Sequence, residues 1–312
     1  MKIVFMGTPD FAATILKSLV EAGHEITGVY TQPDKPKGRS GALIASPVKE
    51  YALSQGFDVY QPQKIKEEEQ VNILRNIDAD IFVVAAFGQF LSKEILDMPK
   101  FGCVNVHGSL LPKYRGAAPI QRSIMNEEKE TGVTIMRMDV GMDSGDIISQ
   151  AITPISLEDD EISLYEKLAE SGARLLIDTL PLIENGTAKY IKQNEDEVTF
   201  AKMLRKEEGC LDFNMTASHL DAIIRGICVW PQGYAFLNGK MLKVCKAKAV
   251  SLEDEAALAL KPGSLFVTKK NLYVACKEGF LELLEVVPEG KKKMPAMDFA
   301  RGSRLVTGDR FD

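Results

Sequence analysis

The sequence predicts an open, mostly parallel α/β sheet domain followed by a small β-barrel domain, and three observations lead to this prediction. Strands and helices alternate at the start of the 312-residue chain, which is typical of βαβ units and therefore of a parallel sheet. Residues 81–86 (IFVVAA) are a continuous apolar run, as expected for a central parallel strand buried on both faces. From about residue 236 the chain instead consists of short strand-like runs between Gly and Asn turns, which favours a barrel.

The first part of the chain supplies the elements of the sheet in sequence order. Residues 2–6 are an apolar run that ends at Gly7, and residues 10–22 carry a helical pattern that Gly23 closes. We expect strands at 2–6, 25–30, 58–60, 81–86, 102–107 and 132–138, and helices at 10–22, 47–55, 64–76 and 163–182. This alternation predicts a sheet that is covered by helices.

The second part begins after a polar stretch without a clear period, at residues 184–199. One helix is expected at 217–226, ahead of the barrel strands. Five runs are expected to form these strands: YAFLNG, KMLKVCKAKAV, GSLFVTKKN, LYVACKEG and FLELLEVVPEG. We therefore expect a first domain at 1–184, a connecting segment at 185–206 and a barrel domain at 207–312.

The composition is that of a globular protein, with 45% hydrophobic and 26% charged residues, which excludes disorder and collagen-like repeats. No stretch approaches the ~20 apolar residues of a membrane span, so we expect no membrane contact and a cytoplasmic location. The five cysteines have no CxxC spacing, which argues against a zinc ribbon or a disulfide framework. Residues 1–200 hold 20 Lys and Arg against 30 Asp and Glu, whereas residues 201–312 hold 18 against 14. The basic second part suggests contact with an anionic partner.

The first strand–helix turn argues against a nicotinamide cofactor. It reads Gly7-Thr8-Pro9 rather than GxGxxG, and a dinucleotide site needs further glycines so that the backbone can approach the pyrophosphate. Asp10, at the start of the helix, would also repel a phosphate. We interpret Gly7 as a tight turn that ends the first strand.

The most informative segment is residues 102–121. Asn105 and His107 alternate with two valines, so the polar pair points to one face of a strand, near the carboxyl end where ligands of open α/β sheets bind. A loop rich in Gly, Pro and Ala follows, and such a loop lets backbone groups approach a flat ligand closely. Taken alone, the pair is better explained by two polar side chains that satisfy each other at the sheet edge.

An acidic loop follows the next strand, at residues 138–146 (MDVGMDSGD). Its glycines and three aspartates mark a loop that we expect at the same edge of the sheet. With Asp143 close to His107, the two side chains would form a carboxylate–imidazole pair that holds the ring. The loop lacks the spacing and the terminal Glu of an EF-hand, so we expect no metal site.

These segments together resemble the 10-formyltetrahydrofolate-dependent formyltransferases. The N-x-H pair, residues 109–120 (SLLPKYRGAAPI) and residues 138–146 match the signature pattern of that family. The similarity extends to residues 6–11 (MGTPDF), 31–34 (TQPD) and 230–236 (WPQGYAF). The resemblance covers nearly the whole chain, and it implies a Rossmann-like first domain that binds folate and an OB-like barrel as the second domain.

The resemblance also implies the reaction, which is transfer of a formyl group from 10-formyltetrahydrofolate to the amino group of methionine on initiator tRNA. It makes three residues catalytic, namely Asn105, His107 and Asp143. It assigns contact with the folate to four loop residues, Ser109, Leu110, Leu111 and Pro112. The chemistry agrees, because the Asn105 amide and a protonated His107 can donate to the developing oxyanion, worth about 3–4 kcal/mol per donor. Asp143 would orient His107 and assist proton transfer.

The loop at residues 32–45 (QPDKPKGRSGALIA) is, by this resemblance, the segment that enters the acceptor end of the tRNA. It carries three basic residues, Lys35, Lys37 and Arg39. Without the resemblance it would be interpreted as a solvated loop. In the barrel, Lys246 and Lys248 share one face of a strand, and we expect them to contact tRNA phosphates. An ordinary lysine-rich surface would look similar.

Two other functions stay open at this point. A formyltransferase that acts on an amino sugar or another small amine would keep Asn105, His107 and Asp143 but would not need the basic loop or the basic barrel. A non-catalytic RNA-binding protein would need none of these three residues. For the favoured function we expect the chain to act as a monomer.

Overall fold

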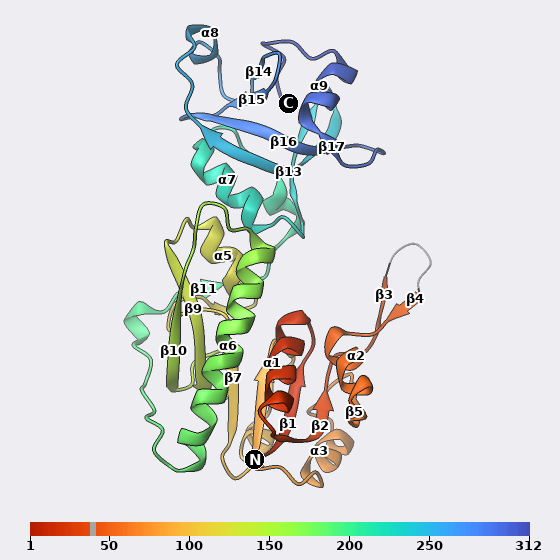
Figure 1. The fold of residues 1–312 in the computed structure, drawn as a ribbon, viewed down its shortest axis with the longest axis vertical. Helices are drawn as coiled ribbons and strands as arrows, with labels where there is room; N and C mark the ends of the chain where they lie inside the picture. Colours follow the sequence, from red (N-terminus) through yellow and green to blue (C-terminus); the bar gives the residue numbers. More distant parts are fainter. Residues whose placement is uncertain (38–41) are drawn as a thin grey trace. The chain divides into compact units, whose positions relative to one another are not determined.

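The computed structural model describes residues 1–37 and 42–312 of the chain. The chain divides into two compact units, each built around its own sheet (Figure 1). The first unit contains Met1–Pro119, Glu130–Pro154 and Tyr165–Ala201. The second unit contains Ile120–Lys129, Ile155–Leu164 and Lys202–Asp312.

A seven-stranded sheet forms the centre of the first unit, and its strand order is β10-β9-β7-β6-β1-β2-β5. The strands are β1 (Lys2–Gly7), β2 (Glu25–Tyr30), β5 (Val59–Tyr60), β6 (Ile81–Ala85), β7 (Cys103–His107), β9 (Glu130–Arg137) and β10 (Ile147–Pro154). The strands from β7 to β5 are parallel to one another, whereas β9 runs antiparallel to both β7 and β10. The sheet is mostly parallel, as the sequence predicts.

Several elements of this unit differ from the prediction, and two of them show why. No strand is predicted at β10, which lies at the edge of the sheet and is mostly exposed or half-buried. Ile152, for example, is 65% exposed. An edge strand with apolar residues on its open face lacks the pattern of a buried strand. The helix expected at 64–76 is shorter, because the N–H of Ile65 donates to the side chain of Gln89 at 2.8 Å and the helix begins only at Glu68.

Helices cover the sheet of the first unit. They are α1 (Asp10–Glu21), α2 (Pro47–Ser54), α3 (Glu68–Arg75), α4 (Lys93–Leu96) and, from Tyr165 onward, α6 (Glu161–Glu184). In Figure 1, α1 and α6 lie in front of the strands, and the rings of Phe11 and Tyr165 meet edge to face with centroids 5.7 Å apart. The buried residues of α1, including Ile15 and Leu19, follow helical spacing and therefore form one apolar face against the sheet.

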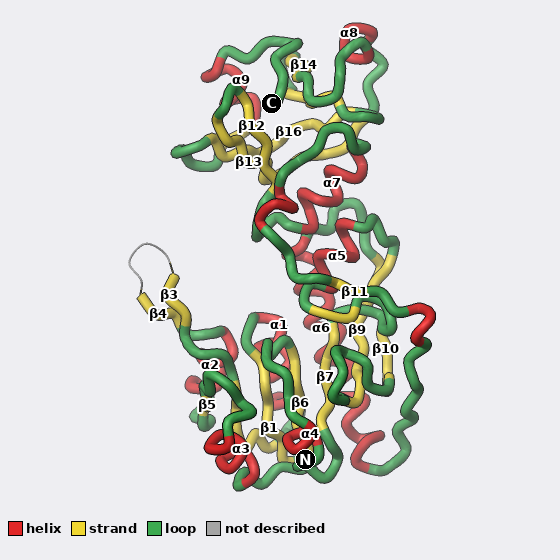
Figure 2. Tube along the Cα trace, turned by 180° about the vertical axis from the view of Figure 1, so that it is seen from behind, coloured by secondary structure: helices red, strands yellow, loops and turns green. Residues whose placement is uncertain are grey.

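The second unit is an antiparallel β domain (Figure 2). Its strands are β12 (Gly233–Leu237), β13 (Lys240–Val250), β14 (Leu265–Val267), β15 (Leu272–Ala275), β16 (Phe280–Pro288) and β17 (Met294–Pro295). They follow the order β12-β13-β16-β15-β14, with β17 also paired to β16, and every pair is antiparallel. All five expected runs form strands.

The helices of the second unit are α7 (Ala217–Gly226), α8 (Glu255–Leu258) and α9 (Ala296–Ser303), and most of α5 (Pro119–Met125) belongs to it as well. The bounds of α7 are those predicted. The predicted fold class, an α/β domain with a mostly parallel sheet followed by an antiparallel β domain, is therefore confirmed. No helix within residues 1–37 and 42–312 is both long enough and apolar enough to cross a membrane.

A glycine allows α6 to lie close to the sheet. A Cβ atom at Gly172 would lie 2.9 Å from a methyl group of Val106 on β7 and 3.1 Å from one of Val133 on β9. Both distances are shorter than ordinary carbon–carbon contacts. The helix therefore packs on β7, the strand that carries Asn105 and His107, at a distance that only glycine permits.

Replacing this glycine by a larger residue tests the packing. We expect Gly172→Val to lower the free energy of unfolding by about 1–3 kcal/mol, because the branched side chain must displace the two valines. Urea denaturation measures the change. The control is Glu170→Val on the exposed side of the same helix, which we expect to change stability by no more than about 0.5 kcal/mol. Equal losses in both variants would contradict the close approach.

Candidate active site

Asn105 and His107 lie on the same face of β7, the strand between β6 and β9. Each alternates with a buried valine, so both point away from the packing side of the strand. Only 9% of Asn105 and 6% of His107 is exposed. Because buried polar groups are normally hydrogen-bonded, neighbouring loops must supply their partners.

Asp143 supplies one set of these partners. Its carboxylate oxygens lie 3.8 Å from Nδ1 of His107 and 3.5 Å from Nδ2 of Asn105. The oxygen that faces His107 also accepts a hydrogen bond from the N–H of Gly116 at 2.8 Å. On the other side of the ring, Nε2 lies 3.0 Å from the carbonyl oxygen of Tyr114. The structure thus brings together the three residues predicted as catalytic, which we call the polar cluster.

The loop that carries Asp143 begins beside the start of β7 and folds back along the strand to the polar cluster. Because β9 runs antiparallel to β7, Arg137 at the end of β9 pairs with Val104 at the start of β7. Loop 138–146 therefore begins at the amino end of β7 and folds back to bring Asp143 beside Asn105 and His107. Asp143 has a φ of +48°, and a Cβ atom at Gly145 would overlap the carbonyl oxygen of Arg137. This tight path requires glycine at 145.

The four residues expected to contact folate differ in their surroundings. Ser109 and Leu111 are buried, and Thr134 accepts from the N–H of Leu111 at 3.1 Å and donates to the carbonyl oxygen of Ser109 at 2.7 Å. Gln150 donates to the carbonyl oxygen of Leu111 at 2.9 Å. The other two residues are partly exposed, namely Leu110 and Pro112. The structure therefore holds the loop at Ser109 and Leu111, and it leaves the side chains of the other two accessible.

Cys103 begins β7 but belongs to the core. It is 1% exposed, and its thiol lies 3.8 Å from the carbonyl oxygen of Leu96. Burial raises the pKa of the Cys103 thiol far above its usual range. Because the thiolate is the reactive form, this cysteine is unsuited to act as a nucleophile.

Two residues that the sequence analysis did not select also contact the site. Arg115 lies in the loop after β7, and Gln193 lies in the polar stretch at 184–199. Gln193 donates to the carbonyl oxygen of Asp143 at 2.8 Å, and Arg115 donates to the side chain of Gln193 at 2.9 Å. In the sequence, an arginine within a Gly- and Ala-rich loop is only weak evidence for a functional residue. Nothing local marks Gln193, because its partners are distant in sequence.

The basic residues of the loop at 32–45 are only partly described. Lys35 and Lys37 belong to β3 (Lys35–Lys37), which pairs with β4 (Ala42–Ile44), and the side chain of Lys35 is exposed. Arg39 lies outside the described residues. The described part therefore places the predicted loop on an antiparallel pair of short strands.

Lys246 and Lys248 are both exposed on one face of β13, as the alternation predicts. In the pairing of β13 with β16, Lys246 lies opposite Glu285 and Lys248 lies opposite Glu282. Oppositely charged cross-strand neighbours attract each other. These carboxylates therefore offset part of the positive charge on this face.

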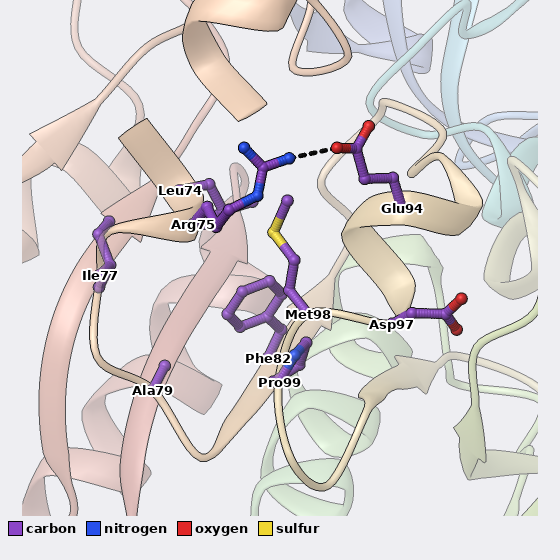
Figure 3. Close-up of a pocket in the computed structure, with 9 residues that line it drawn as sticks. All are labelled: Leu74, Arg75, Ile77, Ala79, Phe82, Glu94, Asp97, Met98 and Pro99. Atoms are coloured by element: carbon purple, nitrogen blue, oxygen red, sulfur yellow. Dashed lines mark hydrogen bonds and ion pairs between the residues drawn. The ribbon is translucent and has the colours of Figure 1, made fainter. Parts of the chain in front are cut away.

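Two cavities lie in the first unit, and the loop that carries Asp143 lines part of the second. The cavity of about 310 Å³ in Figure 3 lies near the amino ends of β6 and β7, and its lining includes the ion pair between Arg75 and Glu94. The second cavity has a volume of about 340 Å³, and Cys103 and Arg137 contribute to its lining. No residue of the polar cluster lines either cavity.

The chemistry of the polar cluster suits proton transfer and stabilisation of negative charge. Asn105 and His107 carry N–H groups, and the Asp143 carboxylate can accept a proton. The cluster contains neither a thiol nor a hydroxyl group that could form a covalent intermediate. Among the residues described, no group of three or more His, Cys, Asp and Glu side chains is arranged to hold a metal ion.

Two family models match the chain, and together they cover most of it. Residues 1–180 match the formyl transferase family, and residues 203–304 match the formyl transferase C-terminal domain. The first match alone covers more than half of the chain. It includes the polar cluster and the loop after β7.

Individual relatives agree with the family models. The chain is 47% identical to a methionyl-tRNA formyltransferase of Agathobacter rectalis, over 100% of this chain and 99% of the relative. It is 45% identical to a methionyl-tRNA formyltransferase of Lachnospira eligens, over 99% and 98% of the two chains. Among solved structures, it resembles the N-formyltransferase of Helicobacter canadensis in complex with folinic acid and dTDP-3-aminofucose, with a TM-score of 0.68. That match covers 94% of this chain and 100% of the other at 20% identity, and it shows the fold alone.

The resemblance inferred from the sequence motifs is therefore confirmed, and so is the predicted class of enzyme. The motifs that carried the resemblance lie in both matched regions, and the full-length relatives leave no large part of the chain unmatched. The chain belongs to the methionyl-tRNA formyltransferase family.

Proposed function

We propose that the protein transfers the formyl group of 10-formyltetrahydrofolate to the α-amino group of methionyl initiator tRNA. The product is N-formylmethionyl-tRNA for the initiation of translation. The observation that carries this proposal is the 47% identity, along the full chain, to a relative named for this reaction. The polar cluster supports it, because its groups match the needs of formyl transfer to an amine.

Two side chains of the cluster would stabilise the transition state. Folate supplies the formyl group, and negative charge develops on the formyl oxygen as the amine attacks. The contact of 3.5 Å between Asn105 and Asp143 is long for a hydrogen bond, so the Asn105 amide can donate to the formyl oxygen instead. Nδ1 of His107 has no closer contact to Asp143 than 3.8 Å, and a protonated ring can donate from this atom. Each such donor is worth about 3–4 kcal/mol in the transition state.

Asp143 would accept the proton that the attacking amine loses. The amine nitrogen forms a bond to the formyl carbon, and the bond from this carbon to the folate nitrogen breaks. Asp143 accepts the proton that the amine loses, directly or through water, and can return it to the departing nitrogen. The same carboxylate holds His107 in place by its charge. No covalent intermediate with the protein is required.

Folate would bind along the loop after β7. We assign contact to Ser109, Leu110, Leu111 and Pro112. The hydrogen bonds of Thr134 to the backbone support this assignment, because they hold the loop in one conformation before a ligand arrives. The partly exposed side chains of Leu110 and Pro112 offer apolar contact to a flat ring.

The tRNA would contact both parts of the chain. We propose a catalytic domain at 1–184, a connecting segment at 185–206 and a tRNA-binding domain at 207–312, and the two family matches support this division. The proposed tRNA contacts are Lys35, Lys37, Arg39, Lys246 and Lys248. Residues 201–312 carry 18 Lys and Arg against 14 Asp and Glu, and basic groups supply the salt-sensitive attraction to phosphates. We further propose that the protein acts as a monomer in the cytoplasm, where this reaction serves translation.

One alternative acceptor follows from the structural comparison. The Helicobacter canadensis enzyme has the same fold and is in complex with an amino sugar nucleotide and a folate. An amino sugar or another small amine is therefore the second candidate acceptor. The basic residues of the loop at 32–45 and the excess of Lys and Arg in residues 201–312 distinguish the two candidates, because a small acceptor needs neither.

The choice of acceptor can be measured directly. With 10-formyltetrahydrofolate as donor, we expect formylation of methionyl initiator tRNA and no comparable turnover of dTDP-3-aminofucose. The readout is formyl-methionine released from the tRNA after hydrolysis. Transfer to the sugar nucleotide without transfer to tRNA would favour the alternative.

A substitution at Asp143 tests the proposed mechanism. We expect Asp143→Asn to lower kcat by about 10²–10⁴-fold, because the amide keeps the size of the side chain but cannot accept the proton. Steady-state formylation of methionyl-tRNA measures the effect. Asp139→Asn, an exposed aspartate in the same loop, is the matched control and should retain the parent kcat. A parent-like Asp143→Asn variant would rule out proton transfer by this residue.

A substitution at Arg39 tests the proposed tRNA loop. We expect Arg39→Ala to lower kcat/KM for methionyl-tRNA by at least about tenfold and to reduce the salt dependence of tRNA binding by about one phosphate contact. Turnover of a small amine acceptor should not change. Lys64→Ala, an exposed lysine outside the loop, serves as the control. Identical tRNA kinetics for Arg39→Ala and the parent would remove this loop from the tRNA site.

A further inference from the structure

A segment that the sequence predicts as part of the interdomain connection is paired to the site at both of its ends. At one end, Ile191 and Ile147 exchange two backbone hydrogen bonds of 2.8 Å, and Ile147 directly follows the Asp143 loop. At the other end, β11 (Phe200–Ala201) pairs with β8 (Arg115–Gly116). We call residues 191–201 the strap.

The strap ends beside the groups that contact Asp143. The N–H of Gly116 on β8 donates to the Asp143 carboxylate, and a Cβ atom at Gly116 would lie 2.8 Å from the carbonyl oxygen of Ala201. Thr199 accepts from the N–H of Tyr114, whose carbonyl oxygen faces His107. The strap therefore sets the position of the backbone that holds two members of the polar cluster.

Gln193 lies near the start of the strap and is buried, with only 9% of the residue exposed. Its Nε2 donates to the carbonyl oxygens of Asp143 and Gly145, both at 2.8 Å. Its Oε1 accepts from Nε of Arg115 at 2.9 Å. Both amide hydrogens and the amide oxygen are therefore engaged, which defines a single orientation of the side chain.

Arg115 connects Gln193 to the loop after β7 by a hydrogen bond. It is 5% exposed, and its guanidinium donates to both carboxylate oxygens of Glu195, at 2.8 and 3.3 Å. These hydrogen bonds lower the pKa of the Glu195 carboxyl group. A buried guanidinium needs such a partner. Arg115 thus links the loop after β7 to two residues of the strap.

The Asp143 loop needs this support because its backbone is strained and folded back. Asp143 has a positive φ, which is uncommon for a residue other than glycine and persists only where the surroundings enforce it. The carbonyl oxygens of Asp143 and Gly145 each need a hydrogen-bond donor when they are shielded from water. Gln193 supplies both donors from one side chain.

We propose that Gln193 is a positioning residue that holds the Asp143 carboxylate toward Asn105 and His107, and that the strap belongs functionally to the active site. This inference rests on the proposed function of Asp143 in formyl transfer. Gln193 acts through the backbone of Asp143, to which its side chain donates a hydrogen bond. A shift of this backbone moves the carboxylate away from the proton that it must accept, which lowers kcat.

The variant Gln193→Glu isolates the two hydrogen bonds to the loop. A carboxylate has the shape of the amide and still accepts from Arg115, but it cannot donate and it repels the two carbonyl oxygens. We expect kcat to fall by about 10–100-fold, with KM for both substrates near that of the parent. Hydrogen exchange at the N–H of Gly116 should become faster, because this group donates to the displaced carboxylate.

Gln232→Glu in the second unit is the matched control. Gln232 likewise accepts from a basic side chain, that of Lys243 at 3.1 Å, and donates to a backbone carbonyl, that of Cys228 at 3.2 Å. It lies in neither the polar cluster nor the strap. We expect this variant to keep the parent kcat and the parent exchange rate at Gly116. Melting temperatures of both variants separate a local effect from a general loss of stability.

A double-mutant cycle with Asp143→Asn tests whether Gln193 acts through Asp143. If it does, Gln193→Glu should have little further effect on kcat in the Asp143→Asn background. Full additivity, or a parent-like kcat and Gly116 exchange rate in Gln193→Glu, would overturn the inference. If the parent fails to formylate tRNA, the proposed function is lost, and the exchange rate at Gly116 alone then decides whether Gln193 positions the loop.

Discussion

The partly buried carboxylate of Asp143 is the constraint on which the rest of the site depends. Only 19% of this side chain is exposed, and a shielded charge is stable only with hydrogen-bond donors around it. The N–H of Gly116 on β8 donates to this carboxylate at 2.8 Å, and the Asn105 amide on β7 lies 3.5 Å from it. Gln193 on the strap holds the backbone of Asp143 itself. The pairings of β7 with β9 and of β8 with β11 bring these groups together.

This arrangement gives the site its polarity before any substrate binds. Donors that are already oriented stabilise a developing charge without reorganising during the reaction. Gly172 supports the other face of β7, because the absence of a side chain lets α6 pack closely on this strand. The strand that carries Asn105 and His107 is thus held from its helix-covered face, while loops hold the polar side chains on the other.

The net negative charge of the first part of the chain opposes the approach of a polyanion. Residues 1–200 carry an excess of acidic residues, so the long-range field of this part repels a polyanion. Even on β13, glutamates of β16 lie opposite Lys246 and Lys248. Under the proposed function, tRNA binding would therefore depend on local basic groups. The Helicobacter canadensis N-formyltransferase, in complex with dTDP-3-aminofucose, has the same fold, so the fold by itself leaves the acceptor undetermined.

The sequence by itself determined the elements and much of the polar cluster. The apolar run of β6 and the alternation of Asn105 and His107 on β7 are local patterns, and local periodicity is what a sequence displays directly. The tertiary structure alone decided the antiparallel direction of β9, the return path of the Asp143 loop and the contact of Gln193 with it. These features depend on pairing between segments far apart along the chain, and no local pattern encodes which distant backbone a polar side chain will meet.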